Sequence, residues 1–523
     1  MPVGNRAINL EVVERPLVQA DSIVVMIDAS IYLTTDGAPL PVERDLRPKA
    51  SSLLIIPPFL KHFGGPMAGP AYLKGAGERA GHAVTVLDLN RQWIQERITS
   101  AHTSGLIKGD HDKPSKELSR LYQDWQALCA SHWPSPLIRN EWESRTVVLN
   151  APHEEVIACA MSLAKGTFGE WVHAHLSKSS RPNIVGLSVM FSGQVLAALA
   201  VTRIIRQVWP GVPVVWGGAH VTALAEPISR DVSYGQGIDG FVVGYAERTW
   251  VELLDAVASS KPWPKEIFAA GTQQFRAKED PKAVPAFDLS GYGAGSLTLP
   301  VQASRGCAYG KCAFCTYPKI EGKHRKLDIE GLEPVIKLAA EREAVLSFKD
   351  SLLVLNQLLI IGDMIKGRIM WSACTKLHPN LNVQTMKRLY AEGLRTLEVG
   401  LETLDEASQE LINKPQKPEV LTSFLDAAAE SGIAVVINYM TDLPGADAVQ
   451  EAYWLKVVRD EVASRPHLNA IIEHNTFQLE MISPMGSNPQ AYGIEVLRSW
   501  PWSSLLEFRL KAKNVSDAYA TAA

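Results

Sequence analysis

The chain has 523 residues and a formal net charge of −4, with 46% hydrophobic and 21% charged residues. This length exceeds what one hydrophobic core supports, so we expect two to four domains, and the small net charge gives no global reason to expect nucleic-acid binding. No apolar run reaches the roughly 18 residues of a transmembrane helix, the first residues lack the apolar core of a signal peptide, and six unevenly placed cysteines argue against a disulfide scaffold. The composition therefore predicts a cytoplasmic protein without a membrane segment.

The first part of the chain predicts the start of a parallel sheet. Residues 1–50 form an extension with one short extended element at 22–27. Residues 51–56 are a continuous apolar run, followed by a Gly- and Pro-rich loop (59–70) and a helix (71–80), which is typical of a buried parallel strand that opens a βα unit. A second strand follows at 83–87. Residues 91–180 interrupt this alternation and predict a mainly helical insertion, with helical patches at 115–132 and 153–164.

The alternation then resumes, with strands at 183–189, 212–218 and 240–244 and helices at 193–208 and from about 248. Strands that alternate with helices predict an α/β fold with a doubly wound, Rossmann-like parallel sheet over 51–255, which binds ligands at the carboxyl ends of its strands. Small residues at such ends let a bulky ligand lie against the backbone. The residues that fall there are Gly64, Gly65, Ser188, Gly217 and Gly218.

A proline-rich linker (256–285) separates this domain from a second βα series. Over 286–482 we expect helices at 333–343, 383–392 and 420–430, and strands at 344–348, 368–373, 396–403, 433–438 and near 476–481. Such a series predicts a partial (β/α)6 barrel, with its site at the carboxyl ends of the strands. Residues 483–523 form a C-terminal tail, which either contacts substrate or closes the core.

Three of the six cysteines, Cys307, Cys312 and Cys315, lie within nine positions. A structural zinc site takes four ligands, and a disulfide would leave one thiol over. Three thiolates suit an iron–sulfur cluster of four irons that keeps one corner open. A zinc site that borrows a distant histidine remains an alternative at this stage.

The cluster loop resembles that of the radical S-adenosylmethionine (SAM) enzymes. The matching residues are Arg305-Gly306-Cys307 and Cys312-Ala313-Phe314-Cys315. The spacing here is C-x4-C-x2-C, whereas the family usually has C-x3-C-x2-C, and Gly310 is available to absorb the extra residue in a tight turn. The resemblance implies a [4Fe-4S] cluster held by the three cysteines and SAM bound beside it, with Phe314 near the adenine.

Further matches follow in the order expected of the radical SAM barrel. Phe348–Ser351, Gly400–Thr403, and Asn438-Tyr439-Met440 with the turn Leu443-Pro444-Gly445 resemble the family's strand ends. They imply that Asp350, Glu402 and Asn438 contact SAM, although Glu402 could instead pair with a neighbouring base. Cys374, on or beside the third barrel strand, is either a second active-site donor or a core residue.

The first domain resembles the cobalamin-binding domain that precedes many radical SAM barrels. Its matching turns are Pro57-Pro58 with the following loop, 186–188, 216–220 and 244–249, although a generic flavodoxin-like sheet would share the coarse pattern. The resemblance implies cobalamin contacts from Gly64, Gly65, Ser188, Gly217, Gly218 and Glu247. His62 is either the lower cobalt ligand or a loop residue, because Leu60 stands where enzymes with a histidine ligand carry an aspartate.

Together these resemblances imply a cobalamin-dependent radical SAM enzyme. The commonest reaction is methylation of an unactivated carbon, or of phosphorus, on a peptide or small secondary metabolite, with electrons from a flavodoxin or ferredoxin. Three alternatives stay open: a cyclase or rearrangement enzyme with the same cofactors, a radical SAM enzyme without cobalamin, and a non-catalytic iron–sulfur or zinc module.

Overall fold

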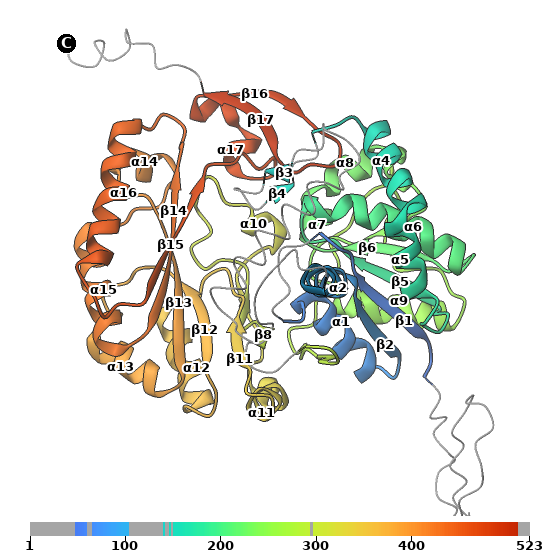
Figure 1. Cartoon of the computed structure of the whole chain (residues 1–523), viewed down its shortest axis with the longest axis horizontal. Coiled ribbons are helices and arrows are strands. Elements are labelled where there is room, and N and C mark those ends of the chain that lie inside the picture. Colours follow the sequence, from blue (N-terminus) through green and yellow to red (C-terminus); the bar gives the residue numbers. More distant parts are fainter. Residues whose placement is uncertain are drawn as a thin grey trace, which may run out of the picture. The chain divides into compact units, whose positions relative to one another are not determined.

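The computed structural model describes residues 48–59, 65–103, 140–141, 146–147, 150–292 and 297–510. Residues from Pro48 onward form one compact unit, which contains two parallel sheets (Figure 1). The predicted extended element at 22–27 and the predicted helical patch at 115–132 lie outside the described residues. Within the described ranges, every helix is too short or too polar to cross a bilayer.

The first sheet is parallel throughout, with its strands in the order β2-β1-β5-β6-β7. This order reverses direction between β1 and β5, which is the position where doubly wound sheets open a ligand site. The strands are β1 (Ser51–Ile56), β2 (Ala83–Asp88), β5 (Ile184–Ser188), β6 (Val214–Gly217) and β7 (Gly240–Phe241).

Helices cover both faces of this sheet, so its central strands are apolar on both sides. Leu53 and Ile55 of β1 face one core, whereas Leu54 faces the other. The first core is closed by α2 (Leu89–Thr103), α4 (His153–Lys165), α5 (Thr167–Leu176) and α6 (Val195–Val208), and the second by α9 (Glu247–Ala258), which packs beside α1 (Ala68–Arg79). Shorter elements complete the domain: α7 (Ala219–Ala223), α8 (Ala225–Arg230), η3 (Ser192–Gln194), η4 (Val232–Gly235) and the hairpin of β3 (Asn140–Glu141) and β4 (Thr146–Val147).

The second sheet has six parallel strands in the order β15-β14-β13-β12-β11-β8, which confirms the predicted partial barrel. The strands are β8 (Thr298–Val301), β11 (Val345–Phe348), β12 (Trp371–Thr375), β13 (Leu394–Glu402), β14 (Ala434–Thr441) and β15 (Ala470–Thr476). Its helices are α10 (Tyr317–Ile320), η5 (Glu330–Leu332), α11 (Glu333–Glu341), α12 (Leu355–Ile365), α13 (Val383–Ala391), α14 (Glu406–Leu411), α15 (Pro418–Ser431) and α16 (Ala448–Ala463).

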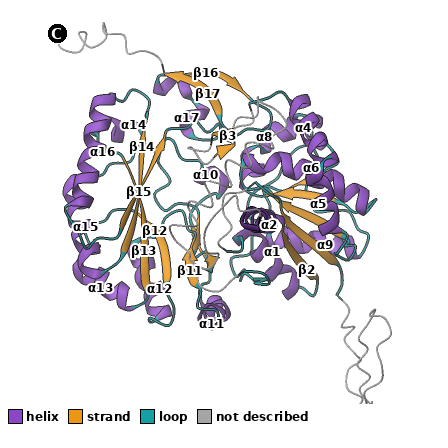
Figure 2. Cartoon of the chain, in the orientation of Figure 1, coloured by secondary structure: helices purple, strands orange, loops and turns teal. Residues whose placement is uncertain are grey.

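Burial alternates along β13 and distinguishes the two faces of the barrel sheet. Leu397, Val399 and Leu401 are fully buried and pack with helix residues such as Phe424 of α15. The helices α12, α13, α15 and α16 lie along this outer side of the strands (Figure 2). Residues at alternating positions, such as Glu398, therefore lie on the opposite, inner face.

Three barrel strands differ from their predictions. The last strand is β15 at Ala470–Thr476, not at 476–481, because its residues alternate with polar ones whereas the buried Phe477 and Leu479 that follow it give a stronger apolar signal. The strand expected at 368–373 is β12, at Trp371–Thr375. The first strand, β8, contains a proline and was not singled out.

The C-terminal segment is structured and reaches the core of the first domain. It contains α17 (Pro484–Ser487), η6 (Pro489–Tyr492) and a hairpin of β16 (Ile494–Ser499) and β17 (Leu506–Leu510). Trp502, between the hairpin strands, is 1% exposed and packs against Trp216 and Tyr234, with ring centroids 6.1 Å and 4.6 Å away. His220 also donates a hydrogen bond to the carbonyl oxygen of Trp502 at 3.1 Å. Trp502 is therefore part of the first domain's core, whereas Met485 and Ile494 of the same tail pack with residues of the radical SAM domain such as Ile412.

We expect Trp502→Ala to lower the free energy of unfolding by about 3–5 kcal/mol, because it empties a fully buried aromatic site. Trp500→Ala is the matched control, since Trp500 is only partly buried, and it should cost about 1 kcal/mol. Urea unfolding of both variants measures the difference. Equal losses would contradict this role of the tail.

Candidate functional site

The cysteine loop starts directly after β9 (Ser304–Arg305), which pairs with β10 (Arg325–Lys326). Gly306 and Gly310 have φ angles of +75° and +60°, so both turns need the left-handed region that favours glycine. The Gly310 N–H donates to Cys307 Sγ at 3.4 Å. The extra residue of the C-x4-C spacing is therefore absorbed at Gly310, and a backbone N–H is directed at one cluster sulfur, which is one way proteins tune cluster potentials.

The three thiols of the loop are partly buried, and burial raises the pKa values of two of them. Burial raises the pKa of Cys312, and burial followed by the charges of Cys312 and Cys307 raises the pKa of Cys315 to about 12. Thiols bind iron as thiolates, so iron binding must displace these protons. Within the described ranges, no three His, Cys, Asp or Glu side chains converge on a site for one metal ion.

Two lysines, Lys414 and Lys376, lie beside the cysteines, and sequence reasoning missed both. Burial alone would lower the pKa of Lys414, but Glu402 at 2.7 Å and the nearby thiols raise it above its usual value. Burial, and then the charge of Lys414, lower the pKa of Lys376, while Cys312 and Cys307 act in the opposite direction. Positive charges next to three cysteines favour the thiolates and an anionic cluster. Neither lysine belongs to a motif that could have revealed it.

Arg305, two positions before Cys307, forms a buried ion pair with Glu247 at the start of α9. The guanidinium is 0% exposed and its Nη2 lies 2.5 Å from Glu247 Oε1. It also bonds Glu279 at 3.2 Å and Gln302 at 3.3 Å, and its Cζ lies 3.8 Å from the ring centroid of Tyr245. The predicted cobalamin residue Glu247 thus has its carboxylate occupied by the cluster loop.

Asp350 and Ser351 of the Phe348–Ser351 motif hold the backbone of the same loop. The Asp350 carboxylate accepts from the N–H groups of Ala303 and Ser304, at 3.0 and 2.5 Å, and from the Ser304 hydroxyl at 2.7 Å. Burial raises the pKa of Asp350 to about 6, although these hydrogen bonds oppose the shift. Ser351 donates to the buried carboxylate of Glu321, which also accepts from the Gly306 N–H. These contacts account for the motif without a ligand, and the SAM contact of Asp350 stays a prediction.

Glu402 has a φ of +64°, a strained conformation for a residue with a side chain. The pairing between β13 and β14 shifts between Gly400 and Glu402, and such bulges re-aim side chains near active sites. A Cβ on Gly400 would lie 2.4 Å from Lys414 Nζ and 2.5 Å from Glu402 Oε1, so a side chain at position 400 would displace this ion pair. Glu402 is thus paired with a base, which sequence reasoning gave as the alternative, and the pair lies near the cluster cysteines.

Asn438 and Cys374, two further predicted residues, share a partner, Glu398. The Asn438 amide donates to Glu398 Oε1 at 2.8 Å, and the Cys374 thiol donates to Oε2 at 3.5 Å. Burial, and then Glu398, raise the pKa of Cys374 to about 12, so the thiol keeps its proton near neutral pH. Sequence reasoning assigned no role to Glu398.

At the carboxyl edge of the first sheet, Ser188 and Gly217 are partly buried at the ends of β5 and β6. A Cβ on Gly218 or Gly65 would lie 2.3 Å or 2.2 Å from the carbonyl oxygens of Val189 or Thr298, so both glycines are required by the chain itself. Phe191, just after β5, is 52% exposed. Sequence reasoning did not select it as a candidate for contact with a cofactor. A small-residue edge with an exposed aromatic ring fits a large, partly apolar cofactor.

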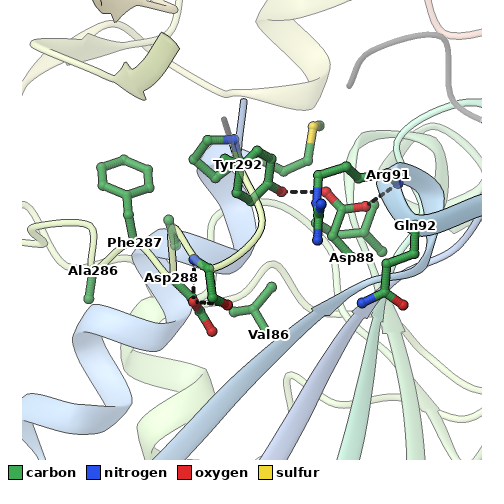
Figure 3. A pocket seen from close by; sticks show the side chains of 13 residues that line it. Val86, Asp88, Arg91, Gln92, Ala286, Phe287, Asp288 and Tyr292 are labelled. Atoms are coloured by element: carbon green, nitrogen blue, oxygen red, sulfur yellow. Dashed lines mark hydrogen bonds between the residues drawn. The ribbon is translucent and has the colours of Figure 1, made fainter. Parts of the chain in front are cut away.

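A cavity of about 50 Å³ lies near this edge, at the ends of β1 and β2 (Figure 3). The Asp88 carboxylate there accepts from the Arg91 N–H at 2.8 Å and the Tyr292 hydroxyl at 2.5 Å. The volume of the cavity suits one or two water molecules, so this cavity is not the site of a cofactor as large as cobalamin.

Three predicted residues remain to be placed. Phe314 is partly buried beside a small apolar cluster that includes Ala313 and Ile412. His62 and Gly64 lie outside the described residues.

Comparison with known families identifies both domains. Residues 172–254 match the model of the B12 binding domain, and residues 301–448 match the Radical SAM superfamily. The chain thus carries a B12 binding domain followed by a radical SAM domain. The predicted cofactors, cobalamin for the first domain and a [4Fe-4S] cluster with SAM for the second, are those of these two families.

Several known proteins resemble this chain. Bacteriochlorophyllide d C-8(2)-methyltransferase of Chlorobaculum tepidum is 23% identical over 266 residues, which cover 46% of this chain and 55% of that protein. The chain thus matches only about half the length of this relative.

The methyltransferase TsrM from Kitasatospora setae, solved with cobalamin and a [4Fe-4S] cluster, aligns with a TM-score of 0.55 and 15% identity over 88% of this chain and 84% of TsrM. OxsB, solved with aqua-cobalamin and SAM, aligns with a TM-score of 0.57 and 13% identity over 91% of this chain and 67% of OxsB. At these identities the solved structures establish a shared fold.

We expect Glu247→Gln to lower the free energy of unfolding by about 3 kcal/mol, because it leaves the buried Arg305 charge with only Glu279. Glu252→Gln is the control on the same helix, since Glu252 forms an exposed pair with Lys278, and it should change stability by less than about 0.5 kcal/mol. Urea unfolding compares the two. A Glu247→Gln loss no larger than that of the control would contradict the role of the buried pair.

Proposed function

We propose that this protein is a cobalamin-dependent radical SAM methyltransferase that methylates an unactivated carbon, or a phosphorus, of a peptide or small secondary metabolite. The observation that carries the proposal is the direct link between the two domains. Arg305 lies just before the first cluster cysteine, and its buried partner Glu247 belongs to the B12 binding domain. Two of the similar proteins, the Chlorobaculum enzyme and TsrM, are methyltransferases.

The cofactors carry the difficult chemistry of such a reaction, and the protein supplies binding and orientation. When bound, the cluster and SAM supply a radical that removes hydrogen from an unreactive carbon, and cobalamin supplies a carrier for the methyl group. Cys307, Cys312 and Cys315 would hold the cluster, and the Gly310 N–H would continue to donate to Cys307. Lys414 and Lys376 would offset the negative charge of the ligated cluster.

For SAM we propose four contacts, of which Glu402 has the most support because its ion pair with Lys414 lies beside the cysteines. The other three are Phe314, Asp350 and Asn438. For cobalamin we propose Gly64, Gly65, Ser188, Gly217 and Gly218, with His62 as candidate lower ligand. The Glu247 carboxylate is paired with Arg305, so Glu247 would contribute to cobalamin binding by fixing the start of α9 and not by a direct side-chain contact. A flavodoxin or ferredoxin in the cytoplasm would supply electrons.

The first test is cofactor content after anaerobic reconstitution with iron, sulfide and cobalamin. We expect about four irons per chain with retained corrin, and loss of iron in Cys312→Ala. Cys159→Ala is the matched control, because Cys159 is a buried free thiol in the first domain, and it should keep its iron. Iron with no retained corrin would contradict cobalamin, and zinc in place of iron would contradict the cluster.

The second test distinguishes methyl transfer from ring formation or rearrangement. With a low-potential reductant and candidate substrates, turnover should yield both S-adenosylhomocysteine and 5′-deoxyadenosine by mass spectrometry, because one SAM donates a methyl group and a second gives the radical. Glu402→Gln should lower both products by about tenfold or more, since a charged contact to SAM contributes about 1.5–3 kcal/mol. A product formed with 5′-deoxyadenosine but no S-adenosylhomocysteine would favour the cyclase alternative.

A further inference from the structure

Three polar side chains meet on the inner face of the barrel, on adjacent strands. Cys374 of β12 pairs in register with Glu398 of β13, and Asn438 of β14 pairs with Gly400, two residues further along. The neighbours of Glu398 in β13, Leu397 and Val399, are fully buried against the outer helices. The Glu398 carboxylate therefore lies inside the barrel, where a radical SAM protein acts on its substrate.

Both oxygens of Glu398 accept hydrogen bonds, and among the residues that the structure describes both donors are neutral. One accepts from the Asn438 amide at 2.8 Å and the other from the Cys374 thiol at 3.5 Å. A carboxylate can accept about four hydrogen bonds, and a thiol is a weak donor. No Lys, Arg or His nitrogen of the described residues is within 4 Å of it, so the fixed carboxylate retains capacity for a strong donor.

Other carboxylates near the site have a cationic partner or backbone N–H donors. Glu247 pairs with Arg305 and Glu402 with Lys414, while Asp350 accepts three hydrogen bonds, two of them from backbone N–H groups. The lysine whose charge acts on Cys374 is Lys349, an exposed residue just after β11. Glu398 has neither a cation nor backbone N–H donors among the described residues, and its position is fixed by two side-chain hydrogen bonds, so it retains acceptor capacity for a cationic group.

We propose that Glu398, held by Asn438 and Cys374, binds a protonated amino group of the substrate and so selects amine-bearing molecules. An ammonium group would donate to the free lone pairs of the carboxylate, and this charged contact would fix the orientation of the substrate inside the barrel. This inference depends on the proposed function only in taking the barrel interior as the substrate site. It would make the substrate an amine-bearing peptide or metabolite.

The test measures binding, not turnover. Reconstituted protein with SAM bound is titrated calorimetrically with primary amines from ethylamine to 2-phenylethylamine, and with the alcohols of the same carbon skeletons. We expect at least one amine to bind ten times more tightly than its matched alcohol. Glu398→Gln keeps the shape and removes the charge, so it should reduce that preference to about twofold or less. Glu419→Gln, an exposed carboxylate on α15, is the control and should retain the preference.

Each other outcome overturns the proposal. No preference for any amine, no binding of any amine, or a preference that survives in Glu398→Gln would each show that the carboxylate does not select a cation. A tenfold loss of SAM affinity in Glu398→Gln, measured in the same titrations, would assign the carboxylate to the cofactor instead. Iron content and unfolding curves verify that the variant is folded. Because the readout needs no methyl transfer, its failure is distinct from failure of the proposed reaction.

Discussion

The buried guanidinium of Arg305 is the contact on which the arrangement of the two domains depends. A charge with no exposure to water is tolerated only when its hydrogen bonds are satisfied, and here Glu247, Glu279 and Gln302 all accept from it while Tyr245 covers its face. Glu247 and Tyr245 come from the B12 binding domain, Glu279 from the segment that follows it, and Gln302 from the connection between β8 and β9. The Arg305 side chain can contact all of these partners only when α9 and the cluster loop keep one fixed position relative to each other.

Charges around the cysteine loop are divided by sign. The buried acids Asp350 and Glu321 hold the loop by accepting its backbone N–H groups, whereas Lys414 and Lys376 lie beside the cysteines. The acids fix the backbone of the loop, and the lysines would compensate the negative charge of a bound cluster. Positioning and electrostatics are thus carried by different residues.

The sequence predicted those features that depend on local pattern or on a short motif. Apolar runs gave both parallel sheets, and the cysteine spacing together with Gly310 gave the cluster loop. It could not reveal Lys414, because that lysine reaches the cysteines only through the fold, nor the role of Trp502, which enters a core formed almost 300 residues earlier. Glu398 did carry a signal, since it alternates with Leu397 and Val399, and strict alternation in a barrel strand indicates an inward side chain. The Gly400–Thr403 motif at the end of the same strand gave the stronger signal, and no role was predicted for Glu398.

The end of β13 shows why that motif has its particular residues. Gly400 leaves the space that the Glu402–Lys414 pair occupies, Leu401 anchors the strand in the outer core, and the bulge turns Glu402 into a conformation that costs about 1–3 kcal/mol. Such strain persists only where surrounding contacts compensate it, and here the compensation is an ion pair beside the cluster cysteines. A carboxylate that served structure alone could make this pair from a relaxed strand end. The strained geometry therefore favours a ligand contact for Glu402, with Lys414 holding the carboxylate in place.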